Sequence, residues 1–468
     1  MKQAILILAS FLFSILFFEK SLGLNLSIFS ICTIGILIAH NPKIFRHKSL
    51  IFLSVTYALT AVVVFVQGSS LSIIANCIVF FTLVGATSQQ HTSVYVTWLN
   101  GLYSTIAGFF HRNFEVNETD EKVKIKKDID VLHLVKLIGI PLIFIITFTL
   151  LYKNGNPMFS DFISKIDFSF INLQWLLFTV LGYFLFQNIS KPVRVEPATS
   201  QDQNTSNDLR PPNHISEEKL RKEKQIGTTL LMLLNTLLVF YIVTDITYLF
   251  TAEITRASEL SNQVHTGINT LIASIVIAIL IILYYFRGDL NFYSKNRNLK
   301  RLTYLWIILN VSLIVLIAIK NHNYITAFGL TYKRIGVHVY LFLALVGLVT
   351  TFFKVLQLKN LAYLFRMNTK IAFAVLVISS ALNWDKLITD YNINVAESFD
   401  IHYLLNLSNR NANLLYYYKD KMDIPESAKN RIATKYRNNL REHQQHDWQE
   451  YSLETFQLES QQQTTTAP

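Results

Sequence analysis

The sequence predicts an all-α fold, a polytopic membrane helix bundle of about eleven spans followed by a short helical soluble tail. Three observations support this prediction. About eleven strongly apolar stretches lie between Gln3 and Trp384. Apolar residues make up 51% of the chain and charged residues only 16%, whereas soluble domains carry about 25% charged residues. Finally, the basic residues fall mainly in alternate loops, which indicates a topology.

The Lys and Arg residues are distributed unevenly among these loops. Of the 42, 26 lie in six alternate loops, 7 in the intervening loops and 9 after Trp384. Loops that face the cytoplasm carry the excess of Lys and Arg in membrane proteins. We therefore expect a multi-pass protein of the bacterial inner membrane, with its N-terminus in the cytoplasm and its C-terminus periplasmic or extracellular.

The expected spans follow from a length criterion, because a membrane helix needs about 20 mainly apolar residues. The first, second and last candidates are short. In chain order the candidates are residues 2–18, 24–40, 49–66, 70–86, 132–152, 173–189, 228–250, 268–286, 302–319, 337–353 and 369–386.

The first apolar run, from Ala4 to Phe18, follows Lys2 and also fits the pattern of a secretory signal. The segment from Glu19 to Gly23 lacks a small-x-small cleavage pattern, and a second apolar run begins at once. We therefore expect a retained helix.

Residues 91–110 permit two interpretations. They are apolar enough for a twelfth span, but that span would move the four lysines between Lys122 and Lys127 to the outer face. Trp98 and Tyr103 suit a helix that lies at the level of the lipid headgroups. We expect such an interfacial helix on the inner face, and a matching element in the Phe-rich outer loop 154–173.

Composition divides the chain into five segments. We expect an N-terminal membrane bundle of about six spans at 1–190 and a second bundle of about five spans at 227–386. The cytoplasmic basic linker between them, 191–226, has too little apolar content to offset the entropy of ordering and is predicted to be disordered. A soluble helical tail at 387–460 and a disordered end at 461–468 complete the chain.

The most concentrated chemical signal is a group of ionisable residues at the outer ends of the second bundle, which we call the outer-face polar cluster. An ionisable side chain at membrane depth is a functional candidate by default. The alternative is that these residues meet water or pair with one another, for instance Asp245 with Arg256 or Arg334. The members of the cluster are Asp245, Glu253, Arg256, His265, Lys333, Arg334, Asp385 and Asp390.

Two of these residues, Lys333 and Arg334, place positive charge in an outer turn, against the charge rule. The planar guanidinium of Arg334 suits bidentate recognition of a phosphate or carboxylate. The alternative is an internal ion pair with Asp245, Glu253 or Asp385. Both interpretations require the turn to fold back onto the bundle.

Other chemistries receive little support. Cys32 and Cys77 lie inside apolar runs, and His443 and His446 have no further metal-binding residue close in sequence. The motifs of nucleotide-binding, hydrolase and zinc-protease sites are absent from the sequence. We therefore expect no cofactor and no metal. Since lipid headgroups account for the basic excess, the expected partners are the lipid bilayer and another membrane or envelope protein, and no nucleic acid.

Four segments resemble the bacterial membrane family known as domain of unknown function 4173. They are Glu259 to Leu271, Tyr324 to Gly336, Trp384 to Asn392, and Asp400 to Leu404. The resemblance covers roughly residues 130–420 and implies a polytopic inner-membrane protein with a short soluble tail. It implies no activity. The pair His265-Thr266 before Gly267 departs from the family pattern.

Three classes of function remain open from the sequence. The soluble tail and basic linker favour an envelope interaction or sensory component. A transporter or flippase would use the outer-face polar cluster to line a polar path, although the spans hold few central charges. A membrane-embedded enzyme would bring Asp245, His265 and Arg334 together on a lipid-linked or envelope substrate.

Overall fold

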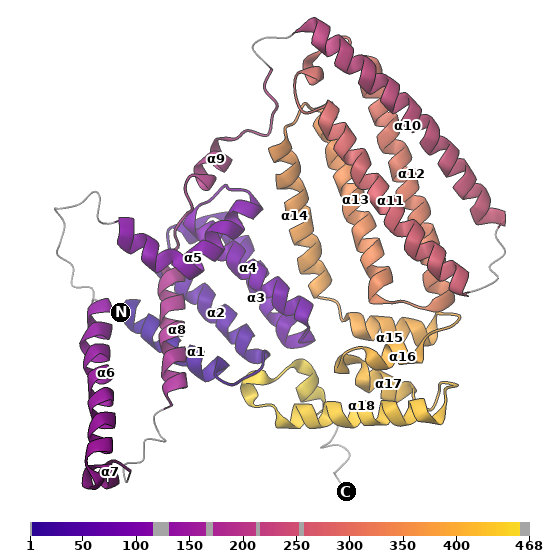
Figure 1. Ribbon diagram of the computed structural model, residues 1–468. Coiled ribbons are helices and arrows are strands. Elements are labelled where there is room, and N and C mark those ends of the chain that lie inside the picture. The colour runs from indigo at the N-terminus through magenta and orange to yellow at the C-terminus, as the bar shows by residue number, and fades with distance from the viewer. Residues whose placement is uncertain (1, 116–130, 165–171, 212–215, 252–256, 459–468) are drawn as a thin grey trace.

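The computed structural model describes residues 2–115, 131–164, 172–211, 216–251 and 257–458, and within these ranges it is helical without a named β-strand. Figure 1 shows the arrangement. The first half contains α1 (Lys2–Phe17), α2 (Leu24–His40), η1 (Ile44–Arg46), α3 (Lys48–Gln67), α4 (Ser70–Ser88), α5 (Val94–Glu115), α6 (Val131–Gly155), α7 (Pro157–Ser164), α8 (Leu173–Ser190) and α9 (Ala198–Asn204). The second half contains α10 (Glu217–Thr251), α11 (Ala257–Tyr285), η2 (Asp289–Phe292), α12 (Arg297–Phe328), α13 (Tyr332–Leu356), α14 (Leu361–Ser380), α15 (Trp384–Asn394), α16 (Ile401–Asn406), η3 (Asn409–Asn411), α17 (Ala412–Tyr418), α18 (Glu426–Gln445) and η4 (Trp448–Glu450).

The helices identify a multi-pass membrane protein. Within the described residues, six helices are long and apolar enough to cross a bilayer, namely α3, α4, α10, α12, α13 and α14. The expected number of eleven spans is not confirmed. Helices α1 and α2 are apolar but have only 16 and 17 residues, and the described apolar part of α11 is Leu271–Tyr285.

The first bundle contains α1 to α4 and α8 around an aromatic core. Phe29, Tyr57, Phe80 and Phe186 are buried at its centre, and their rings contact one another. Aromatic side chains fill this space because each buries a large apolar area, and the rings pack at tilted angles of 39° to 48°. Figure 1 shows these helices side by side, with α6 and α7 set apart from them.

Helix α5 packs closely against α4, and two glycines allow the close approach of the helix backbones. A Cβ atom at Gly85 would lie 1.9 Å from the carbonyl oxygen of Thr97, and one at Gly101 would lie 1.9 Å from that of Phe81. Only glycine permits this approach of two helix backbones. Helix α5 is not among the six candidate spans.

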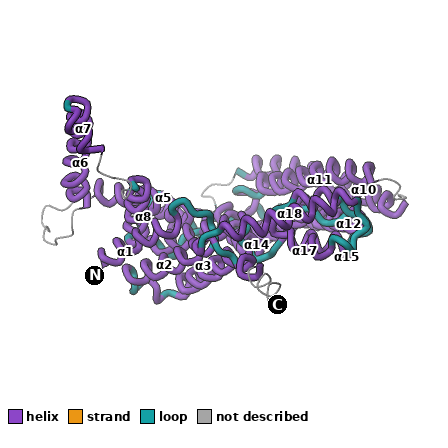
Figure 2. Tube along the Cα trace, turned by 90° about the horizontal axis from the view of Figure 1, so that it is seen from below, coloured by secondary structure: helices purple, strands orange, loops and turns teal. Residues whose placement is uncertain are grey.

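The second bundle contains α10 to α13 around an aliphatic core, where Leu231, Ile275, Ile282 and Leu348 are buried. Figure 2, seen from below, shows the two bundles side by side. Helix α14 joins them, because it packs on α13 while its Phe373 side chain lies against the core of the first bundle. Helix α14, which follows the expected boundary at residue 227 in the sequence, therefore contacts both bundles.

The linker 191–226 differs from the expected disorder, because most of its described part is ordered around Asp202 on α9. The Asp202 carboxylate accepts hydrogen bonds from the Ser93 backbone N–H at 2.7 Å and the Tyr95 hydroxyl at 3.1 Å. It also pairs with Arg366 on α14 at 3.1 Å. These partners offset the cost of ordering a polar segment, which composition alone cannot reveal.

A C-terminal unit, residues 384–458, lies across the opposite end of both bundles (Figure 1). Ile388, Leu404, Leu415 and Ile432 form its core. The unit begins earlier than expected. Helix α14 ends at Ser380, and the side chain of Asn383 accepts a hydrogen bond from the Lys386 N–H to start a new helix, so the span expected at 369–386 stops before Trp384.

Candidate functional site

The turn between α12 and α13 fixes the centre of the candidate site. Gly329 has φ +80°, a left-handed conformation that favours glycine. A Cβ atom there would lie 2.6 Å from the Oδ1 atom of Asn392 on α15. The Asn392 side chain accepts a hydrogen bond from the Leu330 N–H and donates one to the Leu330 carbonyl at 3.0 Å. The C-terminal unit is thereby tied to the turn of the second bundle.

Asp385 is the hub of this junction, and its side chain is only 1% exposed. It accepts hydrogen bonds from the Tyr332 hydroxyl at 2.7 Å and from the Ser408 hydroxyl. Its ion pair with Arg410 spans 3.1 Å. One buried carboxylate therefore joins the start of α13 to two segments of the C-terminal unit, and its charge is compensated by a cation, as a buried charge requires.

Arg334 stabilises the turn from the inside and makes no ion pair with a carboxylate among the described residues. Its guanidinium lies 3.8 Å from the ring centroid of Tyr324 and donates hydrogen bonds to the carbonyls of Phe328, at 2.8 Å, and Gly329. Cation-π stacking and these two carbonyls satisfy the cation. The sequence leaves open an internal ion pair of Arg334 with a carboxylate. The structure instead shows internal contacts of Arg334 with two backbone carbonyls and with the Tyr324 ring.

Lys435 on α18 closes the last turn of α16. Its ammonium donates to the carbonyls of Leu405 at 3.1 Å and Leu407 at 2.7 Å, where the helix dipole favours a cation. Burial lowers the pKa of Lys435 to about 8, and the nearby Asp385 carboxylate acts in the opposite direction. Beside it lies a cavity of about 340 Å³ that Arg431 also lines, with no Asp or Glu in its wall.

The outer-face polar cluster divides into separate groups. Asp245 pairs with Lys320 on α12, and the ion pairs among the described residues include none between Asp245 and Arg334. Lys333 and Asp390 are exposed, and Asp390 accepts a hydrogen bond from Asn394 at 2.8 Å. Glu253 and Arg256 lie outside the described residues, as does the side chain of His265 on α11.

Tyr332 donates a hydrogen bond from its N–H to the Tyr403 hydroxyl at 2.9 Å and one from its own hydroxyl to Asp385. Arg334 and Asp385 occupy one neighbourhood, because the charges of both act on the pKa of Tyr403 in opposite directions. Sequence reasoning missed Tyr324, Arg410 and Lys435. Tyr324 lies ten residues before Arg334, in the same loop expected between two spans. An aromatic ring and an arginine in one loop are a sequence signal that could have predicted their cation-π contact. Arg410 and Lys435 lie in the tail, where nothing in the sequence marks them.

The histidine pair of the tail has a structural setting. His443 lies 2.9 Å from the Thr455 hydroxyl through Nδ1, and its ring centroid is 5.3 Å from that of His446. Burial lowers the pKa of His443. In the part of the chain that the structure describes, no three His, Cys, Asp or Glu side chains are grouped in a way that could hold a metal ion.

The comparisons with known proteins identify a family without an activity. No curated protein and no solved structure matched the chain. One family model, described as domain of unknown function (DUF4153), matches residues 4–417. The family number 4173 expected from the sequence is not confirmed. Since the match spans both bundles and the first part of the C-terminal unit, the chain belongs to the DUF4153 family.

Proposed function

We propose that this multi-pass protein is an envelope interaction or sensory component of the bacterial inner membrane, and that its C-terminal unit is the part that recognises a partner. The observation that carries this proposal is that the unit contacts both bundles. At its start, Asp385 and Asn392 hold the turn of the second bundle. A partner that displaces the unit would therefore act on the membrane helices.

The far end of the unit supports the same proposal through contacts with the first bundle. The Leu24 N–H donates to the Tyr451 carbonyl at 2.9 Å, and the Ser21 N–H donates to the Glu450 carboxylate at 2.7 Å. Lys20 forms an ion pair with Asp447. The unit thus bridges the ends of both bundles. A movement of the unit at one bundle would therefore be transmitted to the other bundle.

The distribution of charge supports an extracytoplasmic position for the unit. The basic loops near Asn41, Asp202 and Lys359 are joined at one end of the bundles by contacts such as that of Asn41 with the Ser190 carbonyl at 3.1 Å. The unit lies at the other end (Figure 1). With the basic end in the cytoplasm, the N-terminus is cytoplasmic and the C-terminal unit faces the envelope.

The surface of α18 indicates the chemistry of the partner. The helix carries five Lys or Arg residues and two Glu residues, and the cavity beside Lys435 and Arg431 has no acidic side chain in its wall. A surface of this charge favours an acidic segment, because complementary potentials speed encounter and suppress wrong partners. We propose an acidic segment of another membrane or envelope protein.

The test places a photo-activatable amino acid at Thr434, in the wall of the cavity, in the full chain in intact cells. We expect one adduct of defined mass, which is lost in the Arg431→Glu variant. The matched control is Arg437→Glu, which reverses an exposed charge on the same helix outside the cavity and should keep the adduct. The same adduct in both variants, or none in the unaltered chain, would contradict the proposal.

A further inference from the structure

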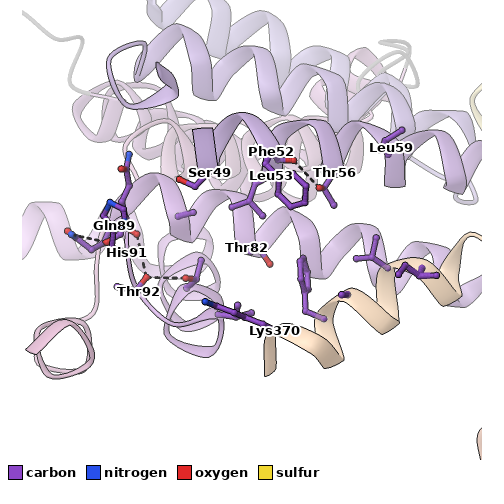
Figure 3. Close-up of a pocket in the computed structure, with 18 residues that line it drawn as sticks. Ser49, Phe52, Leu53, Thr56, Leu59, Thr82, Gln89, His91, Thr92 and Lys370 are labelled. Carbon is purple, nitrogen blue, oxygen red and sulfur yellow. Dashed lines mark hydrogen bonds between the residues drawn. The ribbon is translucent and has the colours of Figure 1, made fainter. Parts of the chain in front are cut away.

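A groove of about 640 Å³ runs between α3, α4 and the start of α5 on one side and α14 on the other. This volume falls in the range of small-molecule sites, about 300–1,000 Å³. Its walls along the spans are apolar and include Phe52, Leu59, Phe373 and Val377. Figure 3 shows Leu59 at one end of the groove. Since α3, α4 and α14 are candidate spans, this part of the groove lies at the depth of acyl chains.

The opposite end of the groove is polar. Gln89, His91 and Thr92 gather there in the turn between α4 and α5, and Lys370 of α14 extends toward them (Figure 3). His91 has φ 60°, a left-handed conformation that is uncommon for a residue other than glycine. This end adjoins the basic linker, because the Gln90 carbonyl accepts a hydrogen bond from Gln203 at 3.1 Å. The polar end therefore lies at headgroup level.

Lys370 is the only Lys, Arg, Asp or Glu among the described residues that line the groove. Arg366, one turn earlier on α14, is held by the Asp202 carboxylate at 3.1 Å. No carboxylate among the described residues lies within ion-pair distance of Lys370, which is exposed, and no Asp or Glu lines the groove. A lysine near the end of a span extends its ammonium to the headgroup region. A ligand that binds this ammonium would carry negative charge at headgroup level.

We propose that this groove binds an anionic phospholipid, with an acyl chain between α3 and α14 and the phosphate group at Lys370. Apolar walls at membrane depth and one cation at headgroup level match the two ends of such a molecule. The lipid would touch both bundles, because α14 belongs to the joint between them. This site is independent of the C-terminal unit and of its proposed partner.

The test uses the full chain exchanged into bilayer nanodiscs that contain phosphatidylglycerol and phosphatidylethanolamine in equal amounts, with retained lipid counted by native mass spectrometry. We expect enrichment of phosphatidylglycerol. The Lys370→Gln variant should reduce that enrichment about fivefold, the effect of one cation near an anionic surface. The Ala374→Trp variant fills the groove and should remove the bound lipid of either headgroup. The control Lys219→Gln removes an exposed lysine of α10 and should behave as the unaltered chain.

Three outcomes would overturn the proposal. One is equal retention of both lipids by the unaltered chain, which would mean an apolar contact without headgroup recognition. Another is identical enrichment in the unaltered, Lys370→Gln and Ala374→Trp chains. The third is a dimer mass that Ala374→Trp abolishes, which would assign the groove to a second copy of the chain.

Discussion

Two buried carboxylates hold the two ends of this molecule in different ways. Asp202, at the basic end, is bound by Ser93 of the first bundle and Arg366 of α14, so it joins the bundles directly. Asp385, at the other end, is bound by Tyr332 and Arg410, so it joins one bundle to a separate unit. At the basic end the linker itself therefore joins the bundles, whereas the other end is joined through the separate C-terminal unit.

The largest expected effect is at Asp385. The Asp385→Ala variant leaves the Tyr332 hydroxyl without its acceptor and Arg410 without its carboxylate partner, and breaking a buried pair costs about 3–5 kcal/mol. Trp384 lies next in sequence, and its fluorescence reports the unfolding of the unit once the other four tryptophans are replaced by phenylalanine. The control Asp390→Ala removes an exposed carboxylate and should change the free energy of unfolding by no more than about 0.5 kcal/mol. Equal effects of the two variants would contradict the role of Asp385 as a hub.

A smaller effect is expected at Asp202, because Arg366 keeps other acceptors, the Thr205 carbonyl at 2.9 Å and the Asn207 side chain at 2.6 Å. The Asp202→Ala variant should lose about 1.5–3 kcal/mol, the range for hydrogen bonds to a charged group. Faster proteolysis within 191–226 is the readout. The Asp208→Ala control removes an exposed ion pair with Lys359, and it should leave the cleavage rate nearly unchanged. Cleavage of both variants at the rate of the unaltered chain would refute an ordered linker.

Glycine variants sharpen the comparison at the end that carries the C-terminal unit. Gly329→Ala places a Cβ atom in a left-handed conformation against Asn392, and we expect a loss of about 1–3 kcal/mol. Gly336→Ala adds a Cβ atom with no neighbour within 4 Å inside α13 and should stabilise the helix by up to about 1 kcal/mol. Thermal unfolding separates the two. A stabilised Gly329→Ala chain would show that the turn is not fixed by Asn392.

The stability contributed at the two ends of the molecule should depend on pH in different ranges, acidic for Asp202 and alkaline for Lys435. Burial raises the pKa of Asp202, but the hydrogen bond from Ser93 and the pair with Arg366 outweigh it, so that the pKa lies below the ordinary value of 3.8. The stability from Asp202 is therefore complete above pH 3.8 and lost as the pH falls through the lowered pKa. Asp202→Asn should flatten this acid dependence.

Lys435 behaves in the opposite sense, because burial lowers its pKa from 10.5 to about 8. Between these values the unfolded chain binds more protons than the folded chain, so stability rises with pH in that window and is constant below it. Lys435→Met should remove this rise, measured as the thermal midpoint of the C-terminal unit from pH 7 to 10. An unchanged pH profile in the variant would exclude Lys435 as its cause.

The sequence predicted the bounds of two of the candidate spans closely. The spans expected at 49–66 and 70–86 correspond to α3 and α4 within about two residues, because a continuous apolar stretch must be helical in a bilayer. The helix expected at 173–189 forms as α8 (Leu173–Ser190), but α8 is not among the six candidate spans. Helix α10 begins at Glu217 rather than at 228, since its first turns are polar and carry no hydropathy signal.

The ordered linker and the junction at Asp385 could not be predicted, for a common reason. Asp202 is ordered by partners 109 residues before it and 164 residues after it in the sequence. Lys435 binds carbonyls 28 to 31 residues away. Local composition reports the cost of ordering a segment, but the compensating contacts depend on how distant segments meet. The predicted roles of the outer-face polar cluster remain predictions.

The most direct test of the account asks whether the C-terminal unit touches the first bundle on the envelope side. Ser21→Cys and Glu450→Cys are introduced together after Cys32 and Cys77 are replaced by alanine, and intact cells are treated with a short, membrane-impermeant thiol crosslinker. The account predicts an intramolecular crosslink in this chain and none when Lys219→Cys replaces Glu450→Cys as the second site. A crosslink that forms only after the membrane is broken, or fails to form at all, would contradict it.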